Sequence, residues 1–264
     1  MADINIKKGH NIQIAGKPSD SVLTFDPLKQ VAIHPYEFKG IKPKLMVKEG
    51  DKVKCGQPIF SSKSNEDISF PSIGGGIISK IEYGERRRIE TILIDLSDQE
   101  ETNTQQSFSL EDIDSLSTES AVDAMKSGCL FSLIRQRPFN NVANPNQLPR
   151  DIFISGWNTA PLSVDLDLAL RGRRSQFQAG IKVLNKLTKG SVHLSYYENT
   201  LSETLLDIED AISHSLTGPH PAGNVGIQIH HIAPISSGEH VWIVNAQDVV
   251  RIGHFFLTGE FDTR

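Results

Sequence analysis

Apolar and polar positions alternate with a period of two in the first part of the chain. The runs lie between Val31 and Leu96, and turns such as Glu49-Gly50-Asp51 and Gly74-Gly75-Gly76 separate them; they read VAIHP, LMVKEGDKV, QPIFSSK, ISFPSIGGGIISKIEY and IETILIDL. This period is typical of strands with one buried face, and the glycine-containing turns favour antiparallel pairing. The pattern predicts a compact β module.

The second part of the chain has a different pattern, in which short apolar runs alternate with segments of helical period. Strands are predicted at Asp151–Ser155, Ser191–Glu198 and His240–Asn245, and helices at Arg174–Leu187, Ser202–His214 and Ala246–Gly259. Strands that alternate with helices indicate βαβ units and a largely parallel sheet.

A polar stretch, Ser97–Ser107, lies between the two patterns. Two short helices are predicted after it, with Ser109 and Ser117 as N-caps and Gly128 at the end of the second. The predicted fold class is therefore α+β multi-domain. It comprises a β-rich module over residues 1–100, a helical linker region over residues 101–150 and an α/β Rossmann-like domain over residues 151–264.

Charge, hydrophobicity and cysteine content argue against a nucleic-acid-binding, membrane-spanning, secreted or disulfide-rich protein. The net charge of the 264 residues is −5, which argues against nucleic-acid binding by phosphate neutralisation. No apolar run approaches the ~18–20 residues of a membrane span, and the N-terminus has no apolar h-region of a signal peptide. Cys55 and Cys129 lie far apart, so we expect no disulfide framework and a cytosolic location.

The stretch GPHPAGNVGIQIHHI, Gly218–Ile232, poses the question of a phosphate loop or a metal site. Its two prolines remove backbone donors, and neither GxGxxG nor a Walker lysine is present. The spacing of His220, His230 and His231 matches no zinc motif, so we predict no metal site. We interpret the stretch as a stiff turn for a partner surface. If Gly223 adopts φ > 0, Gly223→Val is predicted to disturb this turn and assembly.

Two clusters of arginine have structural and functional interpretations. Arg135 and Arg137 precede Phe139 and either bind a carboxylate or phosphate or, as we favour, clamp carbonyls and acidic side chains between domains. The triplet Arg86-Arg87-Arg88 is interpreted as a solvated turn or a protein contact rather than an anionic-lipid site. No GxSxG motif, Cys/His pair or pair of carboxylates at a catalytic spacing is present, so no catalytic residue is predicted.

Val47–Phe60, VKEGDKVKCGQPIF, followed by ISFPSIGGGIISKI, resembles a biotinyl/lipoyl-type flattened barrel. Lys63 stands at about the position of the carrier lysine, but neither a Met-Lys-Met nor an Asp-Lys tip surrounds it. We therefore favour a rigid docking module over a carrier that is modified at Lys63.

The segments IKKGHNIQIAGKP, VKEGDKVKCGQPIF, RQRPF, GPHPAG and VWIVNAQDVVRIGHFFLTGEF, in this order, resemble the A subunit of the Na+-translocating NADH:quinone oxidoreductases. The resemblance implies a peripheral subunit on the cytoplasmic side of the bacterial inner membrane, in a respiratory complex that oxidises NADH, reduces ubiquinone and exports Na+. It also implies that flavins and iron–sulfur centres belong to other subunits and that this chain has no cofactor. Because members of the family are longer, we expect an N-terminal fragment.

The leading hypothesis is a non-redox docking subunit that meets other subunits, especially a membrane-embedded one, and helps to form or cover a quinone site. Its candidate quinone- or partner-binding residues are Arg135, Arg137, Phe139, His220, Gly223 and Trp242. The alternative is a flavin- or nucleotide-binding oxidoreductase domain, which requires a phosphate cradle that the sequence does not show.

Overall fold

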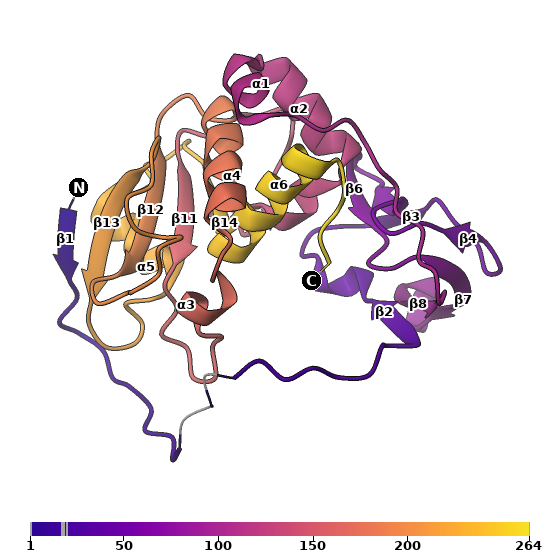
Figure 1. Cartoon of the computed structure of the whole chain (residues 1–264), viewed down its shortest axis with the longest axis horizontal. Coiled ribbons are helices and arrows are strands. Elements are labelled where there is room, and N and C mark those ends of the chain that lie inside the picture. The colour runs from indigo at the N-terminus through magenta and orange to yellow at the C-terminus, as the bar shows by residue number, and fades with distance from the viewer. Residues whose placement is uncertain (1, 17–18, 20, 264) are drawn as a thin grey trace. The chain divides into compact units, whose positions relative to one another are not determined.

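The computed structural model describes residues 2–16, 19 and 21–263 of the chain (Figure 1). By their contacts, the segments form two compact units. One unit joins the chain up to Thr24 with Leu148–Gly253, and the other joins Phe25–Gln147 with His254–Arg264. The first 24 residues thus group with the α/β segment, and residues 101–147 group with the β module. The domain boundaries at residues 100 and 150 stay a prediction.

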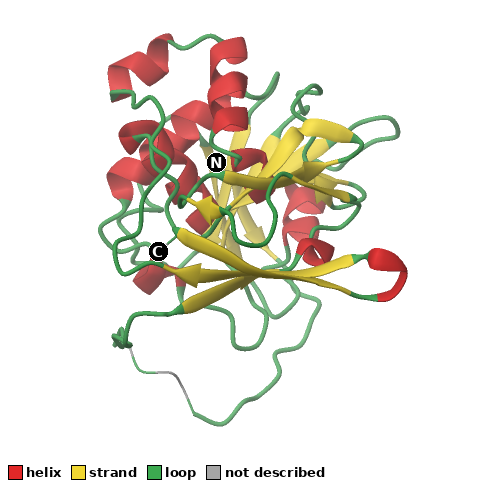
Figure 2. Ribbon diagram, turned by 90° about the vertical axis from the view of Figure 1, so that its right-hand side faces the viewer, coloured by secondary structure: helices red, strands yellow, loops and turns green. Residues whose placement is uncertain are grey.

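The β module consists of two antiparallel sheets. One has the order β2-β8-β7-β4 and the other β3-β5-β6. The strands are β2 (Gln30–Ile33), β3 (Pro43–Leu45), β4 (Lys52–Val53), β5 (Pro58–Ser62), β6 (Asn65–Pro71), β7 (Gly76–Tyr83) and β8 (Ile89–Leu96), with short 3₁₀ turns η1 (Pro35–Glu37) and η2 (Glu85–Arg87). Figure 2 shows these strands from the side of this unit. The predicted β module is confirmed.

The core of the β module is formed by inward-facing residues of both sheets. Phe60 and Phe70 stack with their ring centroids 4.4 Å apart, and Ile78, Ile92 and Ile94 are fully buried in the same cluster. The period-two pattern produces this core because alternate side chains of a strand point to the same face. Each large apolar side chain stabilises the module by about 1.5–3 kcal/mol when it is buried.

The two predicted caps begin two helices of this unit, α1 (Leu110–Ser115) and α2 (Thr118–Ser127). The Ser109 side chain accepts a hydrogen bond from the backbone N–H of Asp112, and Ser117 accepts one from Ser120. Gly128 is the C-cap of α2, as predicted, but its φ is −84°, so it is not there for a left-handed conformation. A side chain at this position would collide with the ring of Phe255. The 3₁₀ turn η3 (Leu130–Leu133) and a hairpin of β9 (Arg135–Arg137) and β10 (Asn141–Val142) follow.

The α/β unit contains parallel strands in the order β1-β13-β12-β11-β14. They are β1 (Ala2–Asn5), β11 (Ile152–Gly156), β12 (Val192–Tyr197), β13 (Ile212–Thr217) and β14 (Val241–Asn245), and the helices are α3 (Leu166–Ala169), α4 (Arg174–Lys186), α5 (Val225–Ile232) and α6 (Ala246–Thr258). In Figure 1 the N-terminal strand β1 lies beside β13, although more than 200 residues separate them in sequence. The predicted parallel sheet is confirmed.

The helix predicted over Ser202–His214 is wrong. This segment forms turns and then strand β13. Asp207 and Asp210 have φ of 52° and 62°, a left-handed conformation that interrupts a right-handed helix. The guanidinium of Arg174 donates to the carbonyls of Glu203, Leu206 and Asp207, which a helix would have paired internally. Tertiary hydrogen bonds therefore override the apolar spacing of this segment.

No helix among the described residues is both long enough and apolar enough to cross a lipid bilayer.

Candidate functional site

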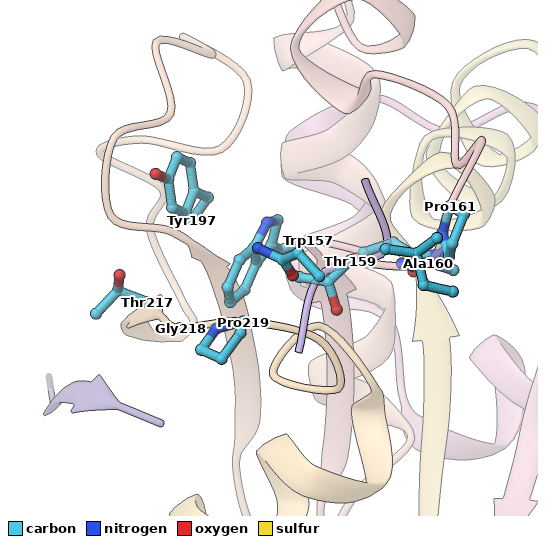
Figure 3. Close-up of a pocket in the computed structure, with 11 residues that line it drawn as sticks. Trp157, Thr159, Ala160, Pro161, Tyr197, Thr217, Gly218 and Pro219 are labelled. Atoms are coloured by element: carbon cyan, nitrogen blue, oxygen red, sulfur yellow. Dashed lines mark hydrogen bonds between the residues drawn. The ribbon is translucent and has the colours of Figure 1, made fainter. Parts of the chain in front are cut away.

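A groove of about 600 Å³ opens at the carboxyl ends of three strands of the α/β unit (Figure 3). The loop after β11, the last residue of β12, the end of β13 and the segment after β1 form its walls. They contribute Asn11, Ile12, Trp157, Asn158, Thr159, Ala160, Pro161, Tyr197, Thr217, Gly218 and Pro219. In open α/β sheets, ligands bind outside the carboxyl ends of the strands, so the position of this groove is that of a binding site.

An aromatic pair forms one wall of the groove. The rings of Trp157 and Tyr197 stack at a centroid distance of 5.1 Å with 24° between their planes. Trp157 is half-buried and packs on a small core of Ile6, Leu216 and Ala222. These contacts with Tyr197 and with the small core hold the indole in the wall of the groove. A planar ligand would find a rigid aromatic surface here.

His220 lies next to the groove and is held from two sides. Its backbone N–H donates to Asn11 Oδ1 at 2.7 Å, and its carbonyl accepts from the N–H of His10 at 2.8 Å. Its ring Nδ1 lies 3.0 Å from the hydroxyl of Thr159, which in turn accepts from the N–H of Gly223 at 3.0 Å. A hydroxyl that accepts one bond can donate its own hydrogen to Nδ1, which favours the Nε2–H tautomer of His220.

The groove is electrostatically neutral. None of the eleven described residues that line it carries a charged side chain. Pro219 has no backbone N–H to offer a phosphate oxygen, as the sequence indicated. A phosphate-bearing ligand would lose hydration without gaining a cation or a nest of N–H groups. The lining suits an uncharged ligand that is planar and accepts or donates a few hydrogen bonds.

The candidate residues His220 and Gly223 border this groove, but the glycine conformation differs from the expectation. Gly223 does not adopt positive φ; Gly218, with φ of 137°, does. Gly223 is required for another reason, because a side chain there would overlap the backbone N of Thr159. The loop therefore depends on close packing at Gly223 and on left-handed geometry at Gly218.

The other candidate residues lie elsewhere. Trp242 is fully buried in β14, so it supports the sheet rather than a surface. Arg135, Arg137 and Phe139 belong to the other unit. Arg135 lies over the ring of Phe38 at 5.4 Å and donates to the carbonyl of Ser132. Both contacts lie within its own unit, so the clamp between domains stays a prediction. The roles of these residues in quinone or partner binding stay predictions.

Phe139 has an exposed side chain, and Arg137 has a side-chain nitrogen without a hydrogen-bond partner among the described residues. The Phe139 side chain is 74% exposed. Nε of Arg137 is buried without a hydrogen-bond partner among the described residues. A partner that covers this hairpin would meet the exposed ring of Phe139, whereas Nε of Arg137 is out of its reach.

Sequence reasoning missed Trp157, Tyr197 and Asn11. A signal for the first two was present, because each aromatic stands at or directly after the carboxyl end of a predicted parallel strand. Asn11 carried no such signal, since its place in the groove depends on the pairing of β1 with β13.

The structure offers no metal centre within the described part of the chain, where no group of three or more His, Cys, Asp or Glu side chains is arranged to hold an ion. His230 and His231 are exposed at the end of α5 with their rings edge to face. Lys63 lies in the two-residue turn between β5 and β6, close to where a carrier lysine is expected. The rigid docking module, favoured over a carrier modified at Lys63, stays a prediction.

Comparisons with known proteins extend over almost the whole chain. Residues 4–97 match the NqrA N-terminal barrel-sandwich hybrid domain, and residues 116–261 match the NqrA second alpha/beta domain. Relatives named as the A subunit of Na(+)-translocating NADH-quinone reductase include that of Rhodopirellula baltica, at 36% identity over 98% of this chain and 57% of the relative. Those of Histophilus somni and Yersinia pseudotuberculosis are 34% and 35% identical over 98% of this chain and 58% of each relative.

The chain thus spans somewhat more than half the length of these relatives. The two matched domains coincide in kind with the β module and the parallel α/β unit of the structure, and they confirm the predicted barrel-sandwich and α/β fold. With both domain types matched and 34–36% identity along 98% of its length, the chain belongs to the NqrA family, the A subunits of the Na+-translocating NADH-quinone reductases.

Proposed function

We propose that the chain acts as a peripheral, non-redox subunit of a bacterial complex that oxidises NADH, reduces ubiquinone and exports Na+. In this proposal it lies on the cytoplasmic side of the inner membrane, docks to other subunits and contributes to the quinone site. The flavins and iron–sulfur centres belong to other subunits. The names of the relatives support the reaction class, and the neutral groove at the carboxyl edge of the sheet carries the quinone part of the proposal.

A quinone head group matches the chemistry of this groove. The head group is a planar, uncharged ring whose two carbonyl oxygens accept hydrogen bonds. Trp157 and Tyr197 offer an aromatic face, and Ile12 and Pro161 add apolar surface. The hydroxyl of Thr217 and the side-chain amides of Asn11 and Asn158 are among the donors of the lining. The exposed lining of the groove is somewhat more polar than apolar, so aromatic contact and a few hydrogen bonds would together hold such a ligand.

The experiment is a titration of a water-soluble short-chain ubiquinone into the purified chain, followed by calorimetry and tryptophan fluorescence. The chain has two tryptophans, and Trp242 is fully buried, so quenching reports on Trp157. We expect saturable binding that weakens roughly tenfold in Trp157→Ala, equivalent to about 1.4 kcal/mol of lost stacking.

Trp157→Phe, which keeps an aromatic face, should restore most of the affinity. Leu201→Ala, at an 86% exposed position outside the groove, is the matched control and should bind like the wild type. Absence of saturable binding, or binding that Trp157→Ala leaves unchanged, would exclude this groove as the quinone contact.

The alternative of a flavin- or nucleotide-binding oxidoreductase domain makes a different prediction. A flavin ring could stack on Trp157, but its phosphate would meet a lining without cations. Visible absorbance of the purified chain separates the two functions: bound flavin would colour the protein yellow and overturn the non-redox proposal.

A further inference from the structure

The hairpin between β7 and β8 ends in a turn that exposes three consecutive arginines. Gly84–Arg88 form the loop, in which the N–H of Gly84 donates to the carbonyl of Arg88 at 2.9 Å and the N–H of Arg88 to that of Glu85 at 3.2 Å. Arg86, Arg87 and Arg88 are all exposed. The strands of this unit and their connecting turns are visible in Figure 2.

The backbone of this turn is unfavourable for arginine. Arg86 and Arg87, its two central residues, have φ of 55° and 58°. Two successive left-handed residues are the geometry of a type I′ turn, for which Asn-Gly is the preferred pair. Arginine has a Cβ that crowds the carbonyl in this conformation, so both positions carry strain that Asn-Gly would not. Because two arginines at these positions lower the stability of the turn, we infer that they serve a purpose other than folding.

The three guanidiniums of the tip, those of Arg86, Arg87 and Arg88, form no ion pair within the described part of the chain. Of the neighbouring acids, Glu82 pairs with Lys80 at 2.7 Å, and the Glu90 carboxylate lies beside the backbone of Gly84 at the start of the loop. The guanidinium carbon of Arg88 lies 5.4 Å from the centroid of the Tyr36 ring, a cation–π contact.

Two exposed tyrosines flank the arginines. Tyr36 is 51% and Tyr83 is 53% exposed. Tyrosine and arginine are enriched among the residues that dominate protein–protein binding energy, because they bury large area and form directional hydrogen bonds. The arginine tip, by which we mean Tyr36, Tyr83 and Arg86–Arg88, therefore has the composition of a protein contact.

A lipid surface fits these observations less well. Polybasic lipid sites contain about four to eight Lys or Arg with little opposing charge. Here only three arginines are present, and Glu82, Glu85 and Glu90 lie near them in the sequence. A rigid turn that presents planar guanidiniums at fixed positions suits carboxylates at fixed positions, as on a folded protein.

We propose that the arginine tip docks onto an acidic, carboxylate-bearing surface of another protein subunit. This inference rests on the proposed membership of a multi-subunit reductase. The strained turn is kept because it aims two guanidiniums at the partner, although it lowers the stability of the free chain.

The test is the binding of the purified chain to the remainder of the reductase complex, isolated in detergent from cells that do not make this subunit. Arg86→Asn/Arg87→Gly removes two charges and provides the preferred turn residues. We expect its affinity for the complex to fall about tenfold or more and the salt dependence of binding to weaken. Its midpoint of thermal unfolding should rise by about 3 °C or more, because the strain is relieved.

Lys7→Gln/Lys8→Gln removes the same charge from an exposed pair in the other unit and should leave the affinity within twofold of wild type. If the wild-type chain does not bind the complex, the proposed function fails and this docking surface with it. If wild type binds and Arg86→Asn/Arg87→Gly binds equally well, the docking surface alone is overturned. Vesicles with a third of anionic lipid form the last arm: sedimentation that depends on Arg86 and Arg87 would replace the protein partner by a lipid one.

Discussion

Gly223 and Gly226 lie three residues apart, and only one of them has room for a side chain. A Cβ at Gly223 would overlap the backbone N of Thr159 and come within 2.8 Å of the carbonyl carbon of Asn158, whereas a Cβ at Gly226 would have no atom within 4 Å. The N–H of Gly223 also donates to Thr159, which holds the ring of His220. The tight contact between the loop after β11 and the turn before α5 therefore requires glycine at residue 223.

We expect Gly223→Val to lower the free energy of unfolding by roughly 2–4 kcal/mol and to weaken quinone binding, because the loop with Trp157 and Thr159 must move. Gly226→Val is the matched control and should change stability by no more than about 0.5 kcal/mol. Denaturant unfolding of both variants measures the difference. Equal stability of the two would mean that the loop accommodates a side chain at residue 223.

At the scale of elements, the strands β12 and β13 place two histidines in contact inside the sheet. His193 Nδ1 and His214 Nε2 lie 3.0 Å apart, and both side chains are buried. Because one ring must donate and the other accept, the hydrogen bond requires at least one neutral imidazole. Burial lowers the pKa of His193, and burial together with the neighbouring His193 lowers the pKa of His214 to about 4.

These lowered pKa values predict a loss of stability in mild acid. The unfolded chain binds a proton on His214 below about pH 6.5, whereas the folded chain does so only near pH 4, so stability falls as the pH drops through this window. The lowered pKa of His193 acts in the same direction. The largest loss of folding free energy that His214 can cause in this window is about 3 kcal/mol. Urea unfolding between pH 7 and pH 4 should show this loss, and His214→Gln should flatten it. His230→Gln, at an exposed histidine, should leave the profile unchanged; an unaltered profile in His214→Gln would refute the assignment.

At the scale of the whole molecule, each compact unit combines distant parts of the chain. The α/β unit takes its outer strand β1 from the N-terminus, and Ile6, directly after it, is buried against Leu216 and Ala222. The N–H of Ile6 continues the pairing with the carbonyl of Thr217. The same segment then brings Asn11 and Ile12 to the groove.

Deletion of residues 2–6 should therefore damage a unit that consists mostly of residues 148–253. We expect a loss of about 3 kcal/mol or more in the stability of the α/β unit, from the buried side chain of Ile6 and the strand hydrogen bonds. Quinone affinity should fall as well, since Asn11 and Ile12 lose their anchor. The control Lys7→Gln/Lys8→Gln keeps β1 and should unfold like the wild type. Unchanged unfolding of the deletion variant would show that β1 adds little to the sheet.

Most elements could be predicted from sequence because their hydrophobic period is local information. The strands of the β module, the caps at Ser109 and Ser117, and the helix that becomes α4 are all confirmed. The exception, Ser202–His214, shows the limit: its apolar spacing suits a helix, but Arg174 binds its carbonyls and two aspartates take left-handed geometry. Hydrogen bonds from a residue that is distant in sequence cannot be inferred from the apolar spacing within a segment.

The order of the residues was enough to establish most element types, the two-part architecture, the poor fit of Gly218–Ile232 to a phosphate or metal motif, and the family resemblance. The place where a ligand can bind emerged only on folding, because the groove joins Asn11, Trp157, Tyr197 and Thr217, which come from four separate strands or their ends. Folding also makes Trp242 part of the core and constrains Gly223 by packing rather than by φ. The physical reason is that hydrophobic period reports which face of an element is buried, whereas a binding site depends on which elements the folded sheet places side by side.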